Sequence, residues 1–131
     1  CRLSPPSFVK CRFRDGGGCG IIARAEGSLI ATQCQIEGNQ LVGVLVAGSG
    51  GNMAMDDCRV EANNCGGVYV CNGGMGSFKK LHIVRNEGVG LLVKTGAAPM
   101  ILETVIEANH GVGAWFASKG KGQLERCHFT A

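Results

Sequence analysis

The chain has little proline, few aromatic residues and no long apolar run. Its 131 residues include 3 prolines and 5% aromatic side chains, whereas glycine occurs 22 times. No stretch of about 18 consecutive apolar residues is present, so the sequence predicts no transmembrane helix. The formal net charge of +3 is too small to favour nucleic acid or an acidic membrane as a partner. Because 45% of the residues are apolar, the many glycines indicate turns in an ordered fold.

Helical periodicity is also absent, and this absence narrows the choice among repeat architectures. No segment sustains a period of about 3.6 residues for long enough to form a helix, which excludes ankyrin and tetratricopeptide arrays. The leucine and asparagine spacing of a leucine-rich repeat is missing as well. What the chain does contain is a repeat of short, strand-like segments separated by Gly and Asn.

The repeat is visible first in six tripeptides whose starts are separated by 23, 24, 23, 23 and 23 residues. They are Cys11-Arg12-Phe13, Cys34-Gln35-Ile36, Cys58-Arg59-Val60, Leu81-His82-Ile83, Thr104-Val105-Ile106 and Cys127-His128-Phe129. Five positions after each of the first five starts comes a turn residue: Gly16, Asn39, Asn63, Asn86 and Asn109. Agreement in this many columns indicates one structural unit per 23 residues.

Glycines mark two further columns. Nine positions after each tripeptide start, a glycine opens an apolar run: Gly20, Gly43, Gly67, Gly90 and Gly113. A second column reads Gly27, Gly50, Gly74, Ala97 and Gly120, and an extra glycine at Gly50-Gly51 explains the one 24-residue repeat. Three strand-like segments per repeat predict an all-β, right-handed parallel β-helix of about five 23-residue rungs, in which each strand pairs with its equivalent one rung away at about 4.8 Å.

Alternation along the strands assigns three columns of side chains to the interior. The first is Phe8, Ala31, Met55, Phe78, Ile101 and Leu124; the others are the first and third residues of the tripeptides. For the asparagine column we expect two roles, namely a left-handed backbone conformation at a tight corner and an amide ladder between rungs. Residues 1–131 are therefore expected to form a single β-helix segment, and the pattern, which starts without Met, predicts a piece of a longer solenoid.

These columns resemble the right-handed β-helix repeat family, the pectin-lyase-like superfamily, over nearly the whole chain. The resemblance implies a β-helix that binds or cleaves carbohydrate. The glycine-rich stretch Gly73–Phe78, the proline-containing stretch Ala97–Leu102 and the stretch Gly120–Glu125 alternate, with Pro6 in the column of Pro99. This alternation is similar to the β-helix of F-box ubiquitin-ligase subunits, which implies a substrate-binding scaffold that meets ubiquitin-ligase components through flanking regions, although no F-box lies in this chain.

The sequence shows no acid and base pair for sugar hydrolysis. The positions where polygalacturonase-like hydrolases place paired Asp residues carry none, and Asp56 and Asp57 are neighbours on a strand that should point to opposite faces. A lyase or epimerase using Lys80, Arg126 and a nearby His is the functional alternative for the charged residues. His82 and His128 share an outward column but lie two rungs apart, about 9.6 Å. No catalytic residue is predicted.

The charged residues are expected to lie mainly on the solvent-exposed surface. The outward column Lys10, Gln33, Asp57, Lys80, Glu103 and Arg126 alternates in sign from Asp57 onward. It predicts a ladder of exposed ion pairs, each contributing less than about 1 kcal/mol. Lys10, Arg12 and Arg14 cluster on the first rung and are expected to form a solvated face, with binding of an acidic partner as the alternative.

Four of the eight cysteines, Cys11, Cys34, Cys58 and Cys127, are predicted to be buried, reduced thiols. They belong to the inward column that also contains Leu81 and Thr104, which indicates a small or medium apolar side chain. Bonds between Cys11 and Cys34, or Cys34 and Cys58, are the open alternative. No zinc or calcium motif is present, so no metal or cofactor is predicted. Free thiols weakly favour a reducing, intracellular compartment.

The most informative surface feature is apolar. The middle residues of the strands opened by the first glycine column should point outward, and all are apolar or aromatic: Ile22, Leu45, Tyr69, Leu92 and Trp115. We expect a ligand-binding stripe for a protein or a glycan, with the two aromatic residues as anchors. The function predicted is a non-catalytic recognition or scaffold β-helix, and the alternative is a carbohydrate-active enzyme with catalytic rungs outside or only partly inside this segment.

Overall fold

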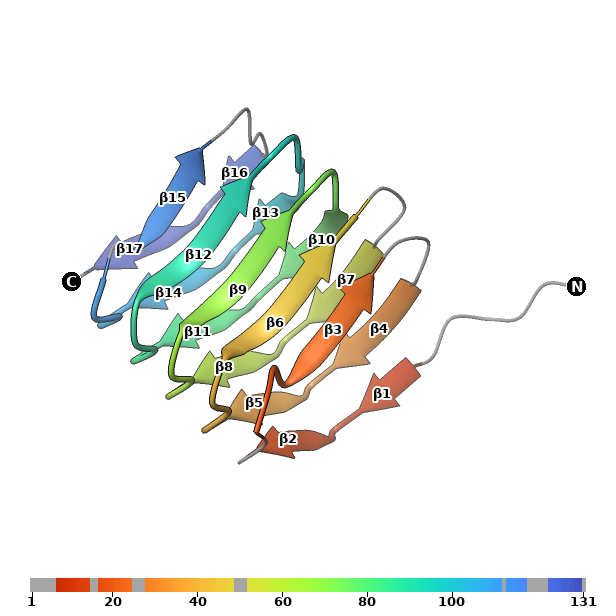
Figure 1. Cartoon of the computed structure of the whole chain (residues 1–131), viewed down its shortest axis with the longest axis vertical. Coiled ribbons are helices and arrows are strands. Elements are labelled where there is room, and N and C mark those ends of the chain that lie inside the picture. The colour runs from red at the N-terminus through yellow and green to blue at the C-terminus, as the bar shows by residue number, and fades with distance from the viewer. Residues whose placement is uncertain are drawn as a thin grey trace, which may run out of the picture.

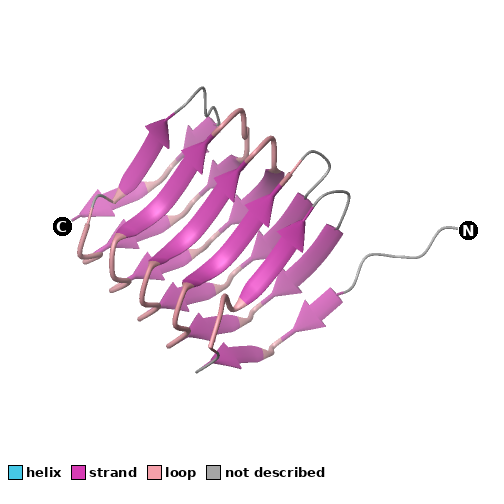
Figure 2. Cartoon of the chain, viewed as in Figure 1, coloured by secondary structure: helices cyan, strands magenta, loops and turns pink. Residues whose placement is uncertain are grey.

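Three parallel β-sheets, stacked around one interior, make up the molecule. The computed structural model describes residues 7–14, 17–24, 28–48, 52–111, 113–117 and 123–130. Successive strands turn from sheet to sheet, so that the chain advances by one rung for every three strands (Figure 1). In the described part of the chain Figure 2 shows strands and loops alone, and no helix there is long and apolar enough to cross a membrane.

Seventeen strands are formed by the described residues, and each sheet collects every third one. The first sheet contains β1 (Ser7–Val9), β4 (Ser28–Thr32), β7 (Asn52–Asp56), β10 (Met75–Lys79), β13 (Met100–Leu102) and β16 (Gln123–Glu125). The second contains β2 (Arg12–Arg14), β5 (Gln35–Glu37), β8 (Arg59–Glu61), β11 (His82–Val84), β14 (Val105–Glu107) and β17 (His128–Thr130). The third contains β3 (Ile21–Arg24), β6 (Val42–Ala47), β9 (Gly66–Cys71), β12 (Val89–Lys94) and β15 (Ala114–Ala117).

The strand register confirms the predicted repeat. Phe13 pairs with Ile36 and Ile36 with Val60, which are steps of 23 and 24 residues. Arg24 lies opposite Ala47, whereas Ser28 lies opposite Asn52, so the extra residue of the long repeat falls between Ala47 and Asn52. The extra glycine predicted at 50–51 lies outside the described residues, as do Gly16, Gly27 and Gly120.

The predicted inward columns form the core. Their members in the middle rungs are at most 2% exposed: Ala31, Met55, Phe78, Ile101, Cys34, Cys58, Leu81, Thr104, Ile36, Val60, Ile83 and Ile106. The same columns are open at the last rung, where Leu124 is 39% and Phe129 46% exposed. At the first rung Phe8 and Phe13 meet edge to face with ring centroids 5.3 Å apart. Stacking of like side chains between rungs therefore holds the coil together.

An asparagine ladder runs through the corner between the second and third sheets. The Nδ2 group of each asparagine donates to Oδ1 of the asparagine one rung further, over 2.9 Å for Asn39 to Asn63, 2.9 Å for Asn63 to Asn86 and 3.0 Å for Asn86 to Asn109. Each Oδ1 also accepts the backbone N–H of the preceding rung's asparagine, as Asn63 does from Asn39 over 3.1 Å. Burial of these amides is possible because the ladder satisfies them.

The expected left-handed conformation of the asparagines is wrong. Positive φ angles occur at the residues directly before them, namely Gly38, Ala62, Arg85 and Ala108. The backbone turns at that residue, so the following asparagine can direct its amide inward. A second series of positive φ angles occupies the corner between the first and second sheets, at Lys10, Gln33, Asp57, Lys80, Glu103 and Arg126. Non-glycine residues bear this strain at both corners.

The first glycine column has a steric cause. A Cβ atom on Gly67 would lie 2.5 Å from the carbonyl oxygen of Gly90 and 3.0 Å from Nδ2 of Asn86. Gly43 and Gly90 face the amides of Asn63 and Asn109 in the same way, at 2.7 and 2.6 Å. Glycine is needed here because the ladder and the next rung fill the space that a side chain would take.

We predict that Asn63→Ala lowers the free energy of unfolding by about 3 kcal/mol, because it removes the acceptor of the side-chain and backbone N–H groups of Asn39 and one of the two donors to Oδ1 of Asn86. Urea denaturation measures the change. Asn64→Ala is the matched control, since the exposed neighbour should change stability by less than about 0.5 kcal/mol. Equal losses in the two variants would contradict the structural role of the ladder.

We predict that Ala62→Gly stabilises the protein by about 1 kcal/mol, because Ala62 is exposed and has a φ of 57°. The same change at exposed Ala54, within β7, should destabilise by about 0.5–1 kcal/mol, since glycine there only adds unfolded-state entropy. Denaturation midpoints of the two variants should therefore move in opposite directions. A shift of the same sign in both would contradict strain at this corner.

Candidate functional site

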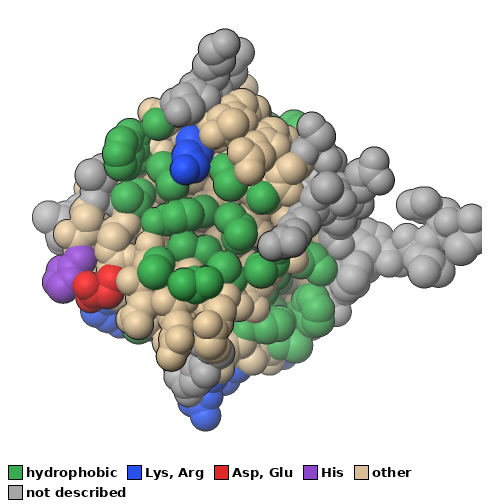
Figure 3. Space-filling model, in the orientation of Figure 1, with side chains coloured by type: hydrophobic (Ala, Val, Ile, Leu, Met, Phe, Trp, Pro, Cys, Tyr) green, Lys and Arg blue, Asp and Glu red, His purple; other side chains and the backbone are tan. Residues whose placement is uncertain are grey.

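The outer face of the third sheet carries one continuous column of apolar side chains. The strand register places Ile22 beside Leu45, Leu45 beside Tyr69, Tyr69 beside Leu92 and Leu92 beside Trp115. We call these five residues the apolar strip. Hydrophobic side chains gather over this sheet in Figure 3, which has the orientation of Figure 1. The structure thus brings all five sequence-predicted residues together, one from each strand.

The five side chains of the strip differ in solvent exposure. Trp115 is 52% and Ile22 42% exposed, and Leu45 and Tyr69 are partly exposed. Leu92 is only 9% exposed, which differs from the expectation of an exposed side chain. The difference arises because its neighbours on the adjacent rungs are the two aromatic residues. Tyr69 and Trp115 are therefore the more exposed neighbours of a buried Leu92.

Tyr69 is held in a fixed position. Its hydroxyl donates to the carbonyl oxygen of Cys65 over 2.6 Å, and its ring covers Gly66, where an added Cβ would lie 2.5 Å from the ring. Partial burial raises the pKa of the Tyr69 hydroxyl above its ordinary value, and the Cys65 thiol adds to this shift. The ring is thus an ordered, neutral surface. No sequence signal pointed to Cys65 and Gly66 as its supports.

A second outward column lies beside the strip. It includes Ala47, Cys71 and Ala117, which are small, and Lys94, which is exposed. Among the described side chains of this outer face Lys94 carries the one formal charge. Alternation along β12 could have identified it, because it lies two positions after Leu92 on the same face.

The corner between the first and second sheets holds the cysteine column. The thiols of Cys34 and Cys58 donate to the carbonyl oxygens of Thr32 and Asp56, two residues earlier, over 3.4 and 3.5 Å. The Thr104 hydroxyl bonds Leu102 in the same way over 2.9 Å, and it accepts the N–H of Leu81 over 3.4 Å. The column therefore accommodates a hydrogen-bonding side chain, not only an apolar one as the sequence suggested.

The cysteines of this column are free thiols, including both members of each pair considered for a disulfide. Burial raises the pKa of Cys58 to about 11, against an ordinary value of 9.0. Cys34 and Cys58 are 1% and 2% exposed, so neither is placed for nucleophilic chemistry. Within the described residues no group of three His, Cys, Asp or Glu side chains could hold a metal ion.

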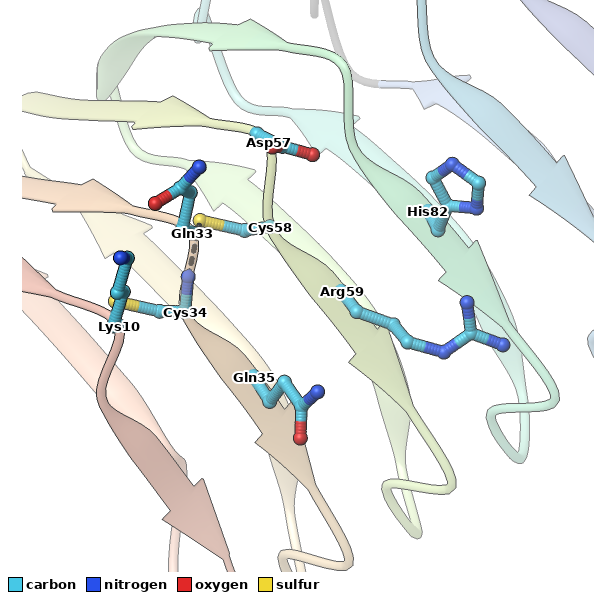
Figure 4. A pocket seen from close by; sticks show the side chains of 8 residues that line it. All are labelled: Lys10, Gln33, Cys34, Gln35, Asp57, Cys58, Arg59 and His82. Carbon is cyan, nitrogen blue, oxygen red and sulfur yellow. Dashed lines mark hydrogen bonds between the residues drawn. The ribbon is translucent and has the colours of Figure 1, made fainter.

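A shallow depression of about 430 Å³ lies along this corner. Figure 4 shows the eight lining residues, which are Lys10, Gln33, Cys34, Gln35, Asp57, Cys58, Arg59 and His82. Asp57 is the single carboxylate among them, so the depression lacks the two carboxylates of a glycosidase. Arg59 and His82 lie side by side on β8 and β11, and Val105 separates His82 from His128 as predicted.

The predicted ion-pair ladder is formed only in part. Arg126 lies 3.5 Å from Glu103, whereas Asp57 and Lys80 form no ion pair within the described residues. The clearest network is on the second sheet, where Glu61 bonds both Arg59 and Arg85. Although burial raises the pKa of Glu61, these two arginines outweigh it and lower the pKa below its ordinary value.

The basic cluster of the first rung is partly neutralised. Arg12 forms an ion pair with Glu37 over 3.3 Å. The cluster is therefore not a field of uncompensated positive charge, which agrees with the expectation of a solvated face.

Three stacked parallel sheets, a 23-residue repeat and an internal asparagine ladder define a parallel β-helix protein. Residues 4–131 match the family model of the right handed beta helix region. Because the match covers nearly the whole chain, the protein belongs to this right-handed β-helix family. No curated protein matches the chain significantly.

We predict that stability falls as pH rises from about 9 to about 11, since the thiol of Cys58 ionises in the unfolded chain before it ionises in the folded one. The raised pKa contributes fully below 9.0 and its contribution is lost toward 11. Cys58→Thr, which introduces the residue type found at position 104 of the same column, should show a smaller loss. Urea denaturation under reducing conditions at pH about 8 and about 10.5 tests this, and equal losses in both proteins would contradict it.

Proposed function

We propose that the protein is a non-catalytic recognition module that binds a protein or glycan ligand on the apolar strip. The observation that carries the proposal is the continuous apolar column over five rungs, which ends at a half-exposed tryptophan. An outward apolar stripe of this length exceeds scattered surface exposure. Tryptophan and tyrosine are among the residue types enriched at the positions that contribute most to binding energy at interfaces.

The fixed positions of the side chains in the strip support the same function. Tyr69 is fixed by its bond to Cys65, and Leu92 is packed between neighbours, so little side-chain freedom is lost when a ligand binds. The described side chains with buried polar atoms all have hydrogen-bond partners, so the interior offers no orphaned group for a ligand. Recognition is therefore best assigned to the outer face.

The setting we propose for such a module is the substrate-binding part of a ubiquitin-ligase subunit. The support is the sequence alternation of glycine-rich and proline-containing rungs that resembles F-box β-helices. Gly74 and Pro99, which mark two of these rungs, are both buried in the structure. Direct association of the full-length parent with ubiquitin-ligase components tests this setting separately from ligand binding.

We predict that binding to peptide and glycan arrays selects a discrete set of ligands and depends on the strip. Trp115→Ala should weaken that binding at least tenfold, as expected of an interface anchor. Met100→Ala, which removes an exposed apolar side chain from the first sheet instead, should leave it unchanged. Ligands retained equally by both variants would contradict the proposal. Cleavage of a uronate polymer that Lys80→Ala or His82→Ala abolishes would favour the carbohydrate-active enzyme.

A further inference from the structure

The turn between β9 and β10 contains the one Asn–Gly pair of the sequence, Asn72–Gly73. Both residues have positive φ angles, of 53° and 79°, and the N–H of Gly74 donates to the carbonyl oxygen of Cys71 over 3.0 Å. Positive φ at both central residues is the pattern of a tight type I′ turn, for which Asn followed by Gly is a preferred pair. This turn carries the chain from the third sheet to the first (Figure 1).

The two central residues of this turn are also chemically reactive toward each other. We propose that Asn72 is a site of spontaneous covalent modification, an inference that does not depend on the recognition function. The backbone nitrogen of Gly73 gives up its proton and attacks the side-chain carbonyl carbon of Asn72. A C–N bond forms and closes a succinimide ring, while the amide NH2 group takes up a proton and leaves as ammonia. Water then opens the ring at either carbonyl, which gives aspartate or isoaspartate.

The side chain of Asn72 is available for this reaction. It is exposed, and it makes no hydrogen bond or ion pair with another residue in the described part of the chain. Gly73 is partly exposed and has no side chain that would shield its nitrogen. The carbonyl carbon that is attacked and the nitrogen that attacks it therefore adjoin each other at the surface of the corner.

The other asparagines of the chain are less suited to the same reaction. Asn63 and Asn86 are at most 1% exposed, and their amides bond the neighbouring rungs. Asn52 and Asn64 are exposed, but each precedes a residue whose side chain crowds the attacking nitrogen. The pair at residues 72–73 is thus the one place in the sequence where glycine follows an asparagine.

The next rung restrains the attacking nitrogen. The N–H of Gly73 donates to the carbonyl oxygen of Thr95 over 2.9 Å. Thr95 and Gly96 form the equivalent turn one rung further, with φ angles of 56° and 78°. Because the nitrogen must leave its hydrogen bond before it attacks, the reaction requires a local opening of this corner. We therefore expect the folded chain to react more slowly than the unfolded chain.

The two products differ in their effect on the corner. Aspartate keeps the backbone and adds a negative charge at an exposed position. Isoaspartate routes the main chain through the former side chain, which adds a methylene group to a two-residue turn. This extra group displaces the donors of two hydrogen bonds, from Gly74 to Cys71 and from Gly73 to Thr95. Accumulation of isoaspartate should therefore loosen the connection between β9 and β10.

Incubation of the folded chain at mildly alkaline pH, followed by peptide mapping and mass spectrometry, tests the proposal. Replacement of NH2 by OH adds about 1 Da, and an endoproteinase that cleaves before aspartate but not before isoaspartate distinguishes the products. We expect Asn72 to convert at least about tenfold faster than any other asparagine, and faster still in urea. A synthetic peptide of residues 69–76 provides the unrestrained rate.

Asn72→Thr is the matched control, because Thr95 shows that this turn accepts threonine. The variant should show no mass change at position 72 and should keep its denaturation midpoint during incubation, whereas the midpoint of the original protein falls. An intact Asn72 in the folded protein after the peptide is fully converted overturns the proposal, as does faster conversion of another asparagine. An equal fall of the midpoint in both proteins overturns the effect on the corner.

Discussion

The asparagine ladder is the interaction on which the rest of the structure depends. It consists of side-chain amides that bond the equivalent amides one rung away and the backbone of the adjacent rung, so it fixes the register between rungs. The glycine column is its direct consequence, because a side chain at Gly43 or Gly67 would meet an amide of the ladder. The left-handed residue before each asparagine serves the same purpose by turning the amide inward. Register in turn aligns the residues of the apolar strip.

The fold could be predicted almost completely from the sequence. A repeat of 23 residues with alternating apolar columns specifies both the strand pairing and the inward faces, and the structure has these columns in its core. What the sequence could not supply was the location of backbone strain. Asn is a familiar left-handed residue, so the pattern suggested Asn63 where the structure places Ala62. The preference of Asn for the left-handed conformation does not predict the backbone here, because the hydrogen bonds of the ladder outweigh that preference.

The surface was less predictable for a different reason. Alternation shows that Leu92 points outward, but its exposure depends on the size of its neighbours across the sheet, which are far away in sequence. The hydrogen bond from Tyr69 to Cys65 likewise depends on how one ring folds back over Gly66. The cysteine column shows the same limit, since a pattern containing Cys, Leu and Thr does not reveal the corner carbonyl that the thiol reaches.

The strip contains one side chain per rung, and this affects how the binding face changes when repeats are gained or lost in evolution. Duplication or loss of a 23-residue unit would lengthen or shorten the binding face by a single residue and by about 4.8 Å, while the ladder and the core stay continuous. The reach of the face is thus coupled to the number of repeats, and its chemistry is set independently at each rung. Ligand length and ligand composition can therefore diverge separately among related chains.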